Sequence, residues 1–144
     1  MIVKRLTLFT LLIISLVSCR VTLVPEYNAK LEEDISKAAK ANDKLYIDLL
    51  DASTEKRVYD TYKERYNDIE SDINSIQLKN EARNNNEDFL KIIKNIKEGF
   101  TEAKKYHKDN KTLSDGEIKA YQATISGLWK PLYIAERGLK INSK

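Results

Sequence analysis

Few residues of this chain could take part in chemistry, and the histidine and the cysteine are the first to consider. His107 is the only histidine and Cys19 the only cysteine among 144 residues. A zinc site of histidine and cysteine ligands needs several such side chains, and a Ser-His-Asp arrangement would depend on His107 alone. Because His107 lies between Lys105 and Lys108, we expect it to be solvated or to cap the frayed end of a helix. The sequence therefore predicts no metal ion and no cofactor.

The carboxylates are numerous, but their spacing does not predict a site. The stretch from Tyr106 to Glu117 ends like a calcium loop of the EF-hand type, yet Lys108 replaces an oxygen ligand and Lys111 replaces the required glycine. Other acidic residues alternate with lysines, as on a solvated surface. No GxGxxG, Walker A or HExxH motif is present. We therefore expect a protein that is not an enzyme.

The residues that precede Cys19 form a recognisable pattern that ends at its thiol. Two cations at positions 4 and 5 precede an uncharged stretch, LTLFTLLIISLV, and Ser18 and Cys19 follow it. This order is typical of a secretory signal peptide. A membrane-spanning helix needs about 20 apolar residues, whereas Arg20 ends this stretch early. We expect the segment to be removed and not kept in the membrane.

The end of this segment resembles the lipobox of bacterial lipoprotein precursors, with Leu16, Val17, Ser18 and Cys19 as the matching residues. The resemblance covers only the first 19 residues. It implies cleavage by the lipoprotein signal peptidase, diacylation of the Cys19 sulfur and a mature protein that begins there. The alternative is an ordinary secreted protein, but an unpaired thiol is a liability in an oxidising compartment. Two or more acyl chains anchor durably, so the resemblance implies a permanent membrane tether.

The resemblance also implies a division of the chain and a location. Residues 1–18 are the predicted signal peptide, residues 19–25 the lipidated cysteine with a short tether, and residues 26–144 one helical domain. Six residues from 20 to 25 reach about 20 Å when extended, which keeps the domain near the bilayer. No acidic cluster follows Cys19. We expect a location in the cell envelope, facing the periplasm on the outer membrane if the host has two membranes.

The composition of the predicted mature domain is nearly balanced in charge. Removing residues 1–18 removes two of the 25 basic residues and none of the 22 acidic ones, which leaves a net charge near +1. Nucleic acid is thereby disfavoured as a partner, because phosphate binding needs a basic patch. Four glycines and two prolines beside 33% charged residues favour long helices over a sheet protein rich in turns.

Apolar residues recur at alternating steps of three and four in four segments, as on one face of a helix. Each stripe is one-sided, so no helix can bury its apolar face alone. Short connections between the segments predict an all-α, up-down antiparallel four-helix bundle. The predicted stripes are Leu31, Ile35, Ala38, Asn42, Leu45 and Leu49, then Tyr59, Tyr62, Tyr66, Ile69, Ile73 and Ile76, then Phe89, Ile93, Ile96, Phe100 and Ala103, and finally Ile118, Tyr121, Ile125, Leu128, Leu132, Ala135 and Leu139.

Capping residues predict where the helices begin. Proline suits the first turn of a helix, and serine, threonine and asparagine suit the position before it. The predicted starts are Pro25 for the first helix, Ser53 or Thr54 for the second, a capping box of Asn84 with Glu87 for the third, and a capping box of Ser114 with Glu117 for the fourth.

Two features depart from the regular pattern. Asn42 occupies a stripe position, where it either fixes helix register at a solvated edge or meets another polar residue such as Asn80 in a polar pocket. Pro131 lies inside the fourth segment and cannot bond to the carbonyl of Gly127, so we expect the helix to kink or break there. Trp129 is then either displayed beside the bend or plugs the core.

The topology predicts that the two ends of the bundle differ. If the first helix leaves the membrane, the turns at 51–54 and 108–114 lie at the far tip, whereas the turn at 83–86 and the C-terminus lie near lipid. We expect an interaction or structural module that contacts an envelope protein or a cell-wall component. The predicted contact residues are Lys111, Asp51 and Trp129.

Two alternatives to this function stay open. One is an immunity or exclusion factor that blocks a toxin, a phage or a conjugating cell. The other is a carrier of a small ligand in a cavity between the helices, with a lining of Tyr46, Tyr62, Tyr66, Tyr121 and Asn42.

Overall fold

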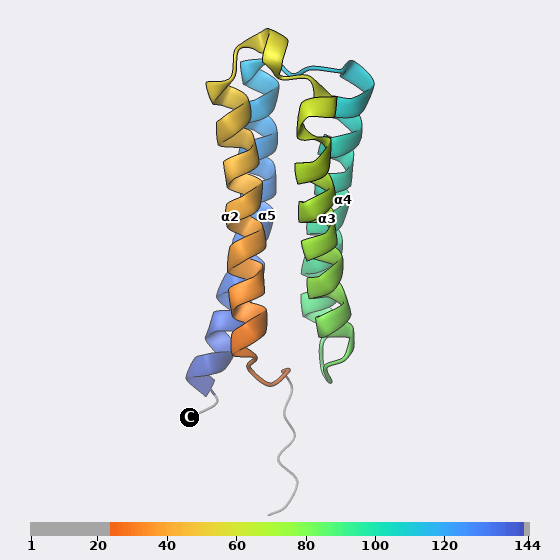
Figure 1. The fold of residues 1–144 in the computed structure, drawn as a ribbon. Coiled ribbons are helices and arrows are strands. Elements are labelled where there is room, and N and C mark those ends of the chain that lie inside the picture. The colour runs from red at the N-terminus through yellow and green to blue at the C-terminus, as the bar shows by residue number, and fades with distance from the viewer. Residues whose placement is uncertain (1–23, 143–144) are drawn as a thin grey trace, which may run out of the picture.

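The described part of the chain, residues 24–142 of a computed structural model, forms a bundle of four long helices (Figure 1). The helices are α2 (Ala29–Asp51), α3 (Tyr59–Glu81), α4 (Glu87–Asn110) and α5 (Asp115–Asn142), and a short 3-10 helix, η1 (Thr54–Lys56), lies between α2 and α3. Successive helices run in opposite directions and are joined by short connections. The predicted four-helix bundle is confirmed.

The helices form a ring in which α5 closes against α2. Helix α2 packs against α3 and α5, and α4 packs against the same two helices. The α2–α3 and α4–α5 turns lie at one end, named here the distal end (residues 51–59 and 110–115) (Figure 1). Residue 24, the α3–α4 turn and the end of α5 lie at the other, the proximal end (residues 24–29, 81–87 and 139–142). The predicted arrangement of the turns is thereby confirmed.

The core consists of the predicted stripes and of their continuation. Every stripe residue predicted for the first three helices is buried. The same spacing extends one step further in two helices, because Asn80 is buried four residues after Ile76 and His107 four residues after Ala103. Both helices thus place a polar side chain at the end of an apolar stripe.

The stripe of α5 is turned slightly from its predicted position. Trp129 and Glu136 are buried, although the predicted stripe contains the residues directly before them, Leu128 and Ala135. The buried stripe residues of α5 are Ile118, Ile125, Leu132 and Leu139, whereas Tyr121, Leu128 and Ala135 are only half-buried. The side of α5 that carries these three half-buried residues is therefore partly exposed to solvent.

The predicted break between Gly127 and Pro131 is wrong. Helix α5 is continuous from Asp115 to Asn142 with Pro131 inside it. Gly127 and Pro131 are both exposed, so water can replace the backbone donor that proline lacks. A change in the direction of the helix axis at this point stays a prediction.

The starts of α2 and α3 differ from the predicted ones. Helix α2 begins after Asn28, whose side chain accepts a hydrogen bond from the Leu31 N–H at 3.0 Å, so Pro25 lies before its first turn. Helix α3 begins at Tyr59, because the residues after Ser53 form η1 first. Ser53 and Thr54 therefore do not cap α3.

The two predicted capping boxes have opposite outcomes. At α5 the box is confirmed, since the Ser114 N–H donates to the Glu117 carboxylate at 2.8 Å and the Glu117 N–H donates to the Ser114 hydroxyl at 3.4 Å. At α4 the preceding residue is Asn86 and not Asn84. The Asn86 side-chain amide donates to the carbonyls of residues 80 and 83 at 2.7 Å each, so it caps the C-terminal end of α3.

Candidate functional site

The residues that carry the lipoprotein resemblance, Leu16, Val17, Ser18 and Cys19, lie outside the described residues. Within residues 24–142, three regions with polar side chains could form a site. These are the proximal end, the distal end and a groove between α2 and α5.

A buried ion pair at the proximal end fastens the beginning of the described chain to the bundle. The Glu136 side chain is 0% exposed and pairs with Arg83 at 2.7 Å. The same carboxylate accepts a hydrogen bond from the Asn28 N–H at 2.9 Å, and Arg83 also donates to the Glu26 carbonyl. We name this group, Arg83 with Glu136 and the backbone of residues 26–28, the proximal clasp.

The proximal clasp supplies protein partners to both charges, although the Arg83 Nε atom is buried without one. A carboxylate taken out of water is stabilised only when donors saturate its oxygens, and Glu136 has donors from Arg83 and Asn28. The Arg83 guanidinium also lies 5.2 Å from the centre of the Phe89 ring, a favourable position for a cation. The clasp therefore fixes where the chain enters the bundle, between α5 and the α3–α4 turn.

The prediction of a solvated His107 is wrong, because the ring lies in the core at the distal end. Its Nε2 atom is 2.8 Å from the Arg57 carbonyl, and its Nδ1 atom is 3.0 Å from the Tyr66 hydroxyl. A carbonyl can only accept, so Nε2 carries the proton and neutral Nδ1 accepts from Tyr66. Burial lowers the pKa of His107, although the bond to the Arg57 carbonyl partly opposes this shift. The sequence signal for the burial of His107 is its position four residues after Ala103, which continues the apolar stripe.

Arg57 joins three segments at the distal end, and sequence reasoning missed it. Its guanidinium is buried and donates to the carbonyls of Leu50 at 3.2 Å and Ala52 at 2.9 Å. It also forms an ion pair with Asp115 at the start of α5. No apolar periodicity marks this position, since Arg57 lies in the connection after η1.

The predicted contact residues do not share one surface. Asp51, the last residue of α2, and Lys111, the C-cap residue after α4, are both exposed at the distal end. Lys111 has a φ of 67°, and its carbonyl accepts a hydrogen bond from the Tyr59 N–H at 2.9 Å. Trp129 is 3% exposed and belongs to the core, so its prediction as a displayed residue is wrong.

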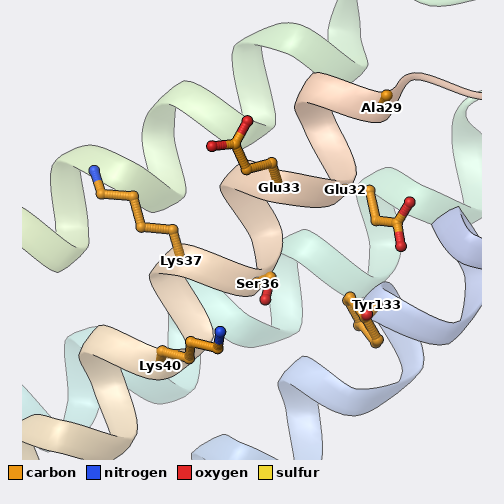
Figure 2. A pocket seen from close by; sticks show the side chains of 7 residues that line it. All are labelled: Ala29, Glu32, Glu33, Ser36, Lys37, Lys40 and Tyr133. Atoms are coloured by element: carbon orange, nitrogen blue, oxygen red, sulfur yellow. The ribbon is translucent and has the colours of Figure 1, made fainter.

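A groove runs between α2 and α5 (Figure 2). It has a volume of about 480 Å³, and a neighbouring hollow of about 260 Å³ shares Ser36, Lys40 and Tyr133 with it. Figure 2 shows Glu32 and Ser36 of α2 near Tyr133 of α5, whereas Lys37 extends away from it. Cations and carboxylates are mixed along this groove, so its charge favours no particular ion. No group of three histidine, cysteine or carboxylate side chains among residues 24–142 could hold a metal ion.

The interior of the bundle contains polar atoms without protein partners. Both polar atoms of the Asn42 side chain and the Tyr46 hydroxyl are buried and form no hydrogen bond. Asn42 is therefore not at a solvated edge. It is not bonded to Asn80 either, since the Asn80 amide donates to the Ile76 carbonyl and accepts from Arg83, both at 3.0 Å.

No helix in the described range is long and apolar enough to cross a bilayer. Comparison with known protein families, with curated proteins and with solved structures finds no match.

Proposed function

We propose that this chain is the precursor of a lipoprotein of the cell envelope, anchored through an acylated Cys19, and that its helical domain acts by contact with a partner. The observation that carries this proposal is the order of cations, apolar stretch and Leu16-Val17-Ser18-Cys19 in the sequence. The only thiol of the chain occupies the one position at which a lipobox needs it.

The proximal clasp supports a membrane anchor at one end of the bundle. The five residue-to-residue steps from Cys19 to the first described residue, residue 24, reach about 17 Å when extended. Residues 26 and 28 are bonded to Arg83 and Glu136, so the described chain begins at the proximal end of the bundle. Helix α2 has 23 residues and is therefore about 35 Å long, which presents the distal end away from the anchor.

The bonding of the buried charged groups supports contact as the mode of action. Arg57 and His107 both form hydrogen bonds to backbone carbonyls, and His107 also bonds to a tyrosine hydroxyl. Arg83 forms an ion pair with Glu136. Such groups stabilise the ends of the helices. Asp51 and Lys111 remain exposed at the distal end, where a partner in the envelope could reach them.

Substitution of Cys19 tests the anchor. We expect the unaltered protein to sediment with membranes and to enter the detergent phase in phase-separation experiments. Cys19→Ser should abolish acylation and cleavage, whereas Ser18→Ala should leave both intact, because the lipobox accepts small residues at that position. Normal processing of Cys19→Ser would contradict the proposal.

Cross-linking tests the proposed contact at the distal end. A photoreactive residue at Lys111 should trap one defined envelope partner in intact cells. The matched control is Lys91, which is also an exposed lysine but lies near the proximal end of α4. Adducts from Lys91 with none from Lys111 would contradict a distal contact.

A ligand carrier is a second candidate, because Asn42 and the Tyr46 hydroxyl are buried without partners. A small polar molecule between the helices would satisfy these atoms. Native mass spectrometry of the gently extracted protein should then detect an added mass that Asn42→Leu removes. A spectrum with the acylated chain alone would reject this function.

A further inference from the structure

The solvent face of α5, from the middle of the helix to its proximal end, carries charge of one sign. After Glu117 the only acidic residue of α5 is Glu136, and its side chain is buried and paired with Arg83. Lys130 and Arg137 are exposed on the same part of the helix. This stretch of α5 therefore presents cations to solvent without a neighbouring carboxylate of its own.

Two large apolar side chains lie among these cations. Ile134 is 57% exposed and Ile141 is 77% exposed. Steps of four, three and four residues separate Lys130, Ile134, Arg137 and Ile141, which places all four on one face of the helix. We name these four residues the α5 corner. It combines aliphatic and cationic side chains, as helices that lie in a membrane interface do.

The α3–α4 turn, on the other side of the proximal clasp from the α5 corner, carries a different charge. Glu81, Glu87 and Asp88 are exposed there, and of these Asp88 is paired with Lys91 at 2.9 Å. An anionic surface would therefore attract the α5 corner and repel the region of the α3–α4 turn. Lys79 and Lys91 are also exposed near this turn, so its charge differs from that of the α5 corner in degree.

We infer that the α5 corner lies against anionic phospholipid headgroups and tilts the bundle, with α5 toward the bilayer and the α3–α4 turn away from it. This inference rests on the proposed anchor at Cys19, because the anchor holds the proximal end within reach of the lipid. Ile134 and Ile141 enter the headgroup region while Lys130 and Arg137 pair with lipid phosphates.

The charge of the α5 corner favours lipid over a second copy of the chain. A symmetric dimer through this face would bring Lys130 and Arg137 of one chain close to the same cations of the other. Like charges in contact disfavour such an interface. An anionic bilayer surface supplies the complementary charge over a wide area, at the end of the bundle where the described chain begins.

Fluorescence quenching in vesicles tests the inference on the acylated protein. Because acylation occupies Cys19, Ile134→Cys offers the single free thiol for an environment-sensitive dye. The matched control is Ile47→Cys, which replaces an isoleucine that is 48% exposed and lies in the distal half of α2. Vesicles contain phosphatidylglycerol, phosphatidylcholine and lipids with nitroxide groups near the headgroup.

We expect quenching at position 134 to exceed that at position 47 several-fold. The excess should shrink in vesicles of phosphatidylcholine alone and in the Lys130→Glu/Arg137→Glu background, since both remove the charge attraction. Equal quenching at the two positions would overturn the inference. So would a blue shift at position 134 that grows with protein concentration in the absence of lipid quenching, because it would indicate contact between copies.

Failure of the anchor gives a different result. Without acylation the dye would also label Cys19, and the protein would not float with vesicles of phosphatidylcholine alone. If the protein floats and labels only at the introduced cysteine, an unquenched position 134 rejects the lipid contact and leaves the anchor in place.

Discussion

The two ends of the bundle each hold a largely buried arginine, but the two arginines are stabilised in different ways. At the distal end, Arg57 donates to two backbone carbonyls and pairs with Asp115, whose side chain is 64% exposed. At the proximal end, Arg83 pairs with Glu136, whose side chain is 0% exposed. The carboxylate partner is thus accessible to water at one end and fully enclosed at the other.

This difference predicts unequal roles for the two ion pairs. Carbonyls would still surround Arg57 after loss of Asp115, and an exposed carboxylate adds little to stability. Loss of one partner in the proximal clasp would leave the other charge enclosed without compensation, which is strongly destabilising. The free energy of unfolding should therefore depend much more on the proximal ion pair than on the distal one.

The largest expected effect comes from breaking the proximal clasp. Arg83→Met should lower the free energy of unfolding by about 3–5 kcal/mol, because it leaves the Glu136 carboxylate buried and unpaired. Urea denaturation measures this change. The double variant Arg83→Met/Glu136→Leu should recover most of the loss, since it removes both charges. Losses that simply add in the double variant would contradict the role of the pair.

The next effect is a pH dependence from His107. Burial lowers its pKa in the folded state, so the unfolded chain binds a proton more readily than the folded one. Stability should be complete above the ordinary pKa of about 6.5 and fall below it, with a slope of at most about 1.4 kcal/mol per pH unit. The loss should level off once the pH is below the folded pKa.

Denaturation curves between pH 7.5 and 5 measure this dependence, with His107→Gln as the control. The groups against the imidazole are the hydroxyl of Tyr66, the rings of Tyr59 and Tyr62 and the carbonyl of Arg57. The difference between the native and variant curves isolates His107 from the carboxylates. A difference that does not change with pH would refute the assignment.

A smaller effect of opposite sign is expected at the centre of the bundle. Asn42→Leu should raise the free energy of unfolding by about 1–2 kcal/mol, because it removes buried polar atoms that have no partner. Asn80→Leu is the matched control and should be destabilising, since its side chain is bonded to Ile76 and Arg83. Thermal and urea denaturation compare the two variants. A loss of stability in Asn42→Leu would indicate that a partner satisfies the amide.

The smallest effect is expected at the distal ion pair. Asp115→Asn should change the free energy of unfolding by less than about 1 kcal/mol, because the carboxylate is mostly solvated. The measurement is again urea denaturation, at low and at high salt. A change as large as that of Arg83→Met would remove the contrast between the two ends.

The fold could be predicted because the apolar residues of this chain follow one rule. Burial of a single helix face requires alternating steps of three and four, and Leu31, Tyr66 and Phe100 all lie in stripes predicted in this way and buried in the structure. The Ser114 capping box could be predicted as well, since both of its residues lie within one turn. Local spacing is sufficient for such features.

The polar groups could not be predicted from local spacing. Glu136 and Arg83 are 53 residues apart, and nothing near either of them indicates the partner. His107 and Asn80 continue apolar stripes, but a stripe position does not reveal whether a polar side chain finds a bonding partner there. For Trp129 the sequence allows display beside Pro131 or a plug in the core, and the structure confirms the core position.

The proposed anchor depends on the chemical state of Cys19, which mass spectrometry of the protein extracted from membranes measures directly. We predict a chain that begins at Cys19, with a diacylglyceryl group on the sulfur. A chain that still carries residues 1–18, or one in which Cys19 has a free thiol, would contradict the proposed anchor and the lipid contact inferred from it.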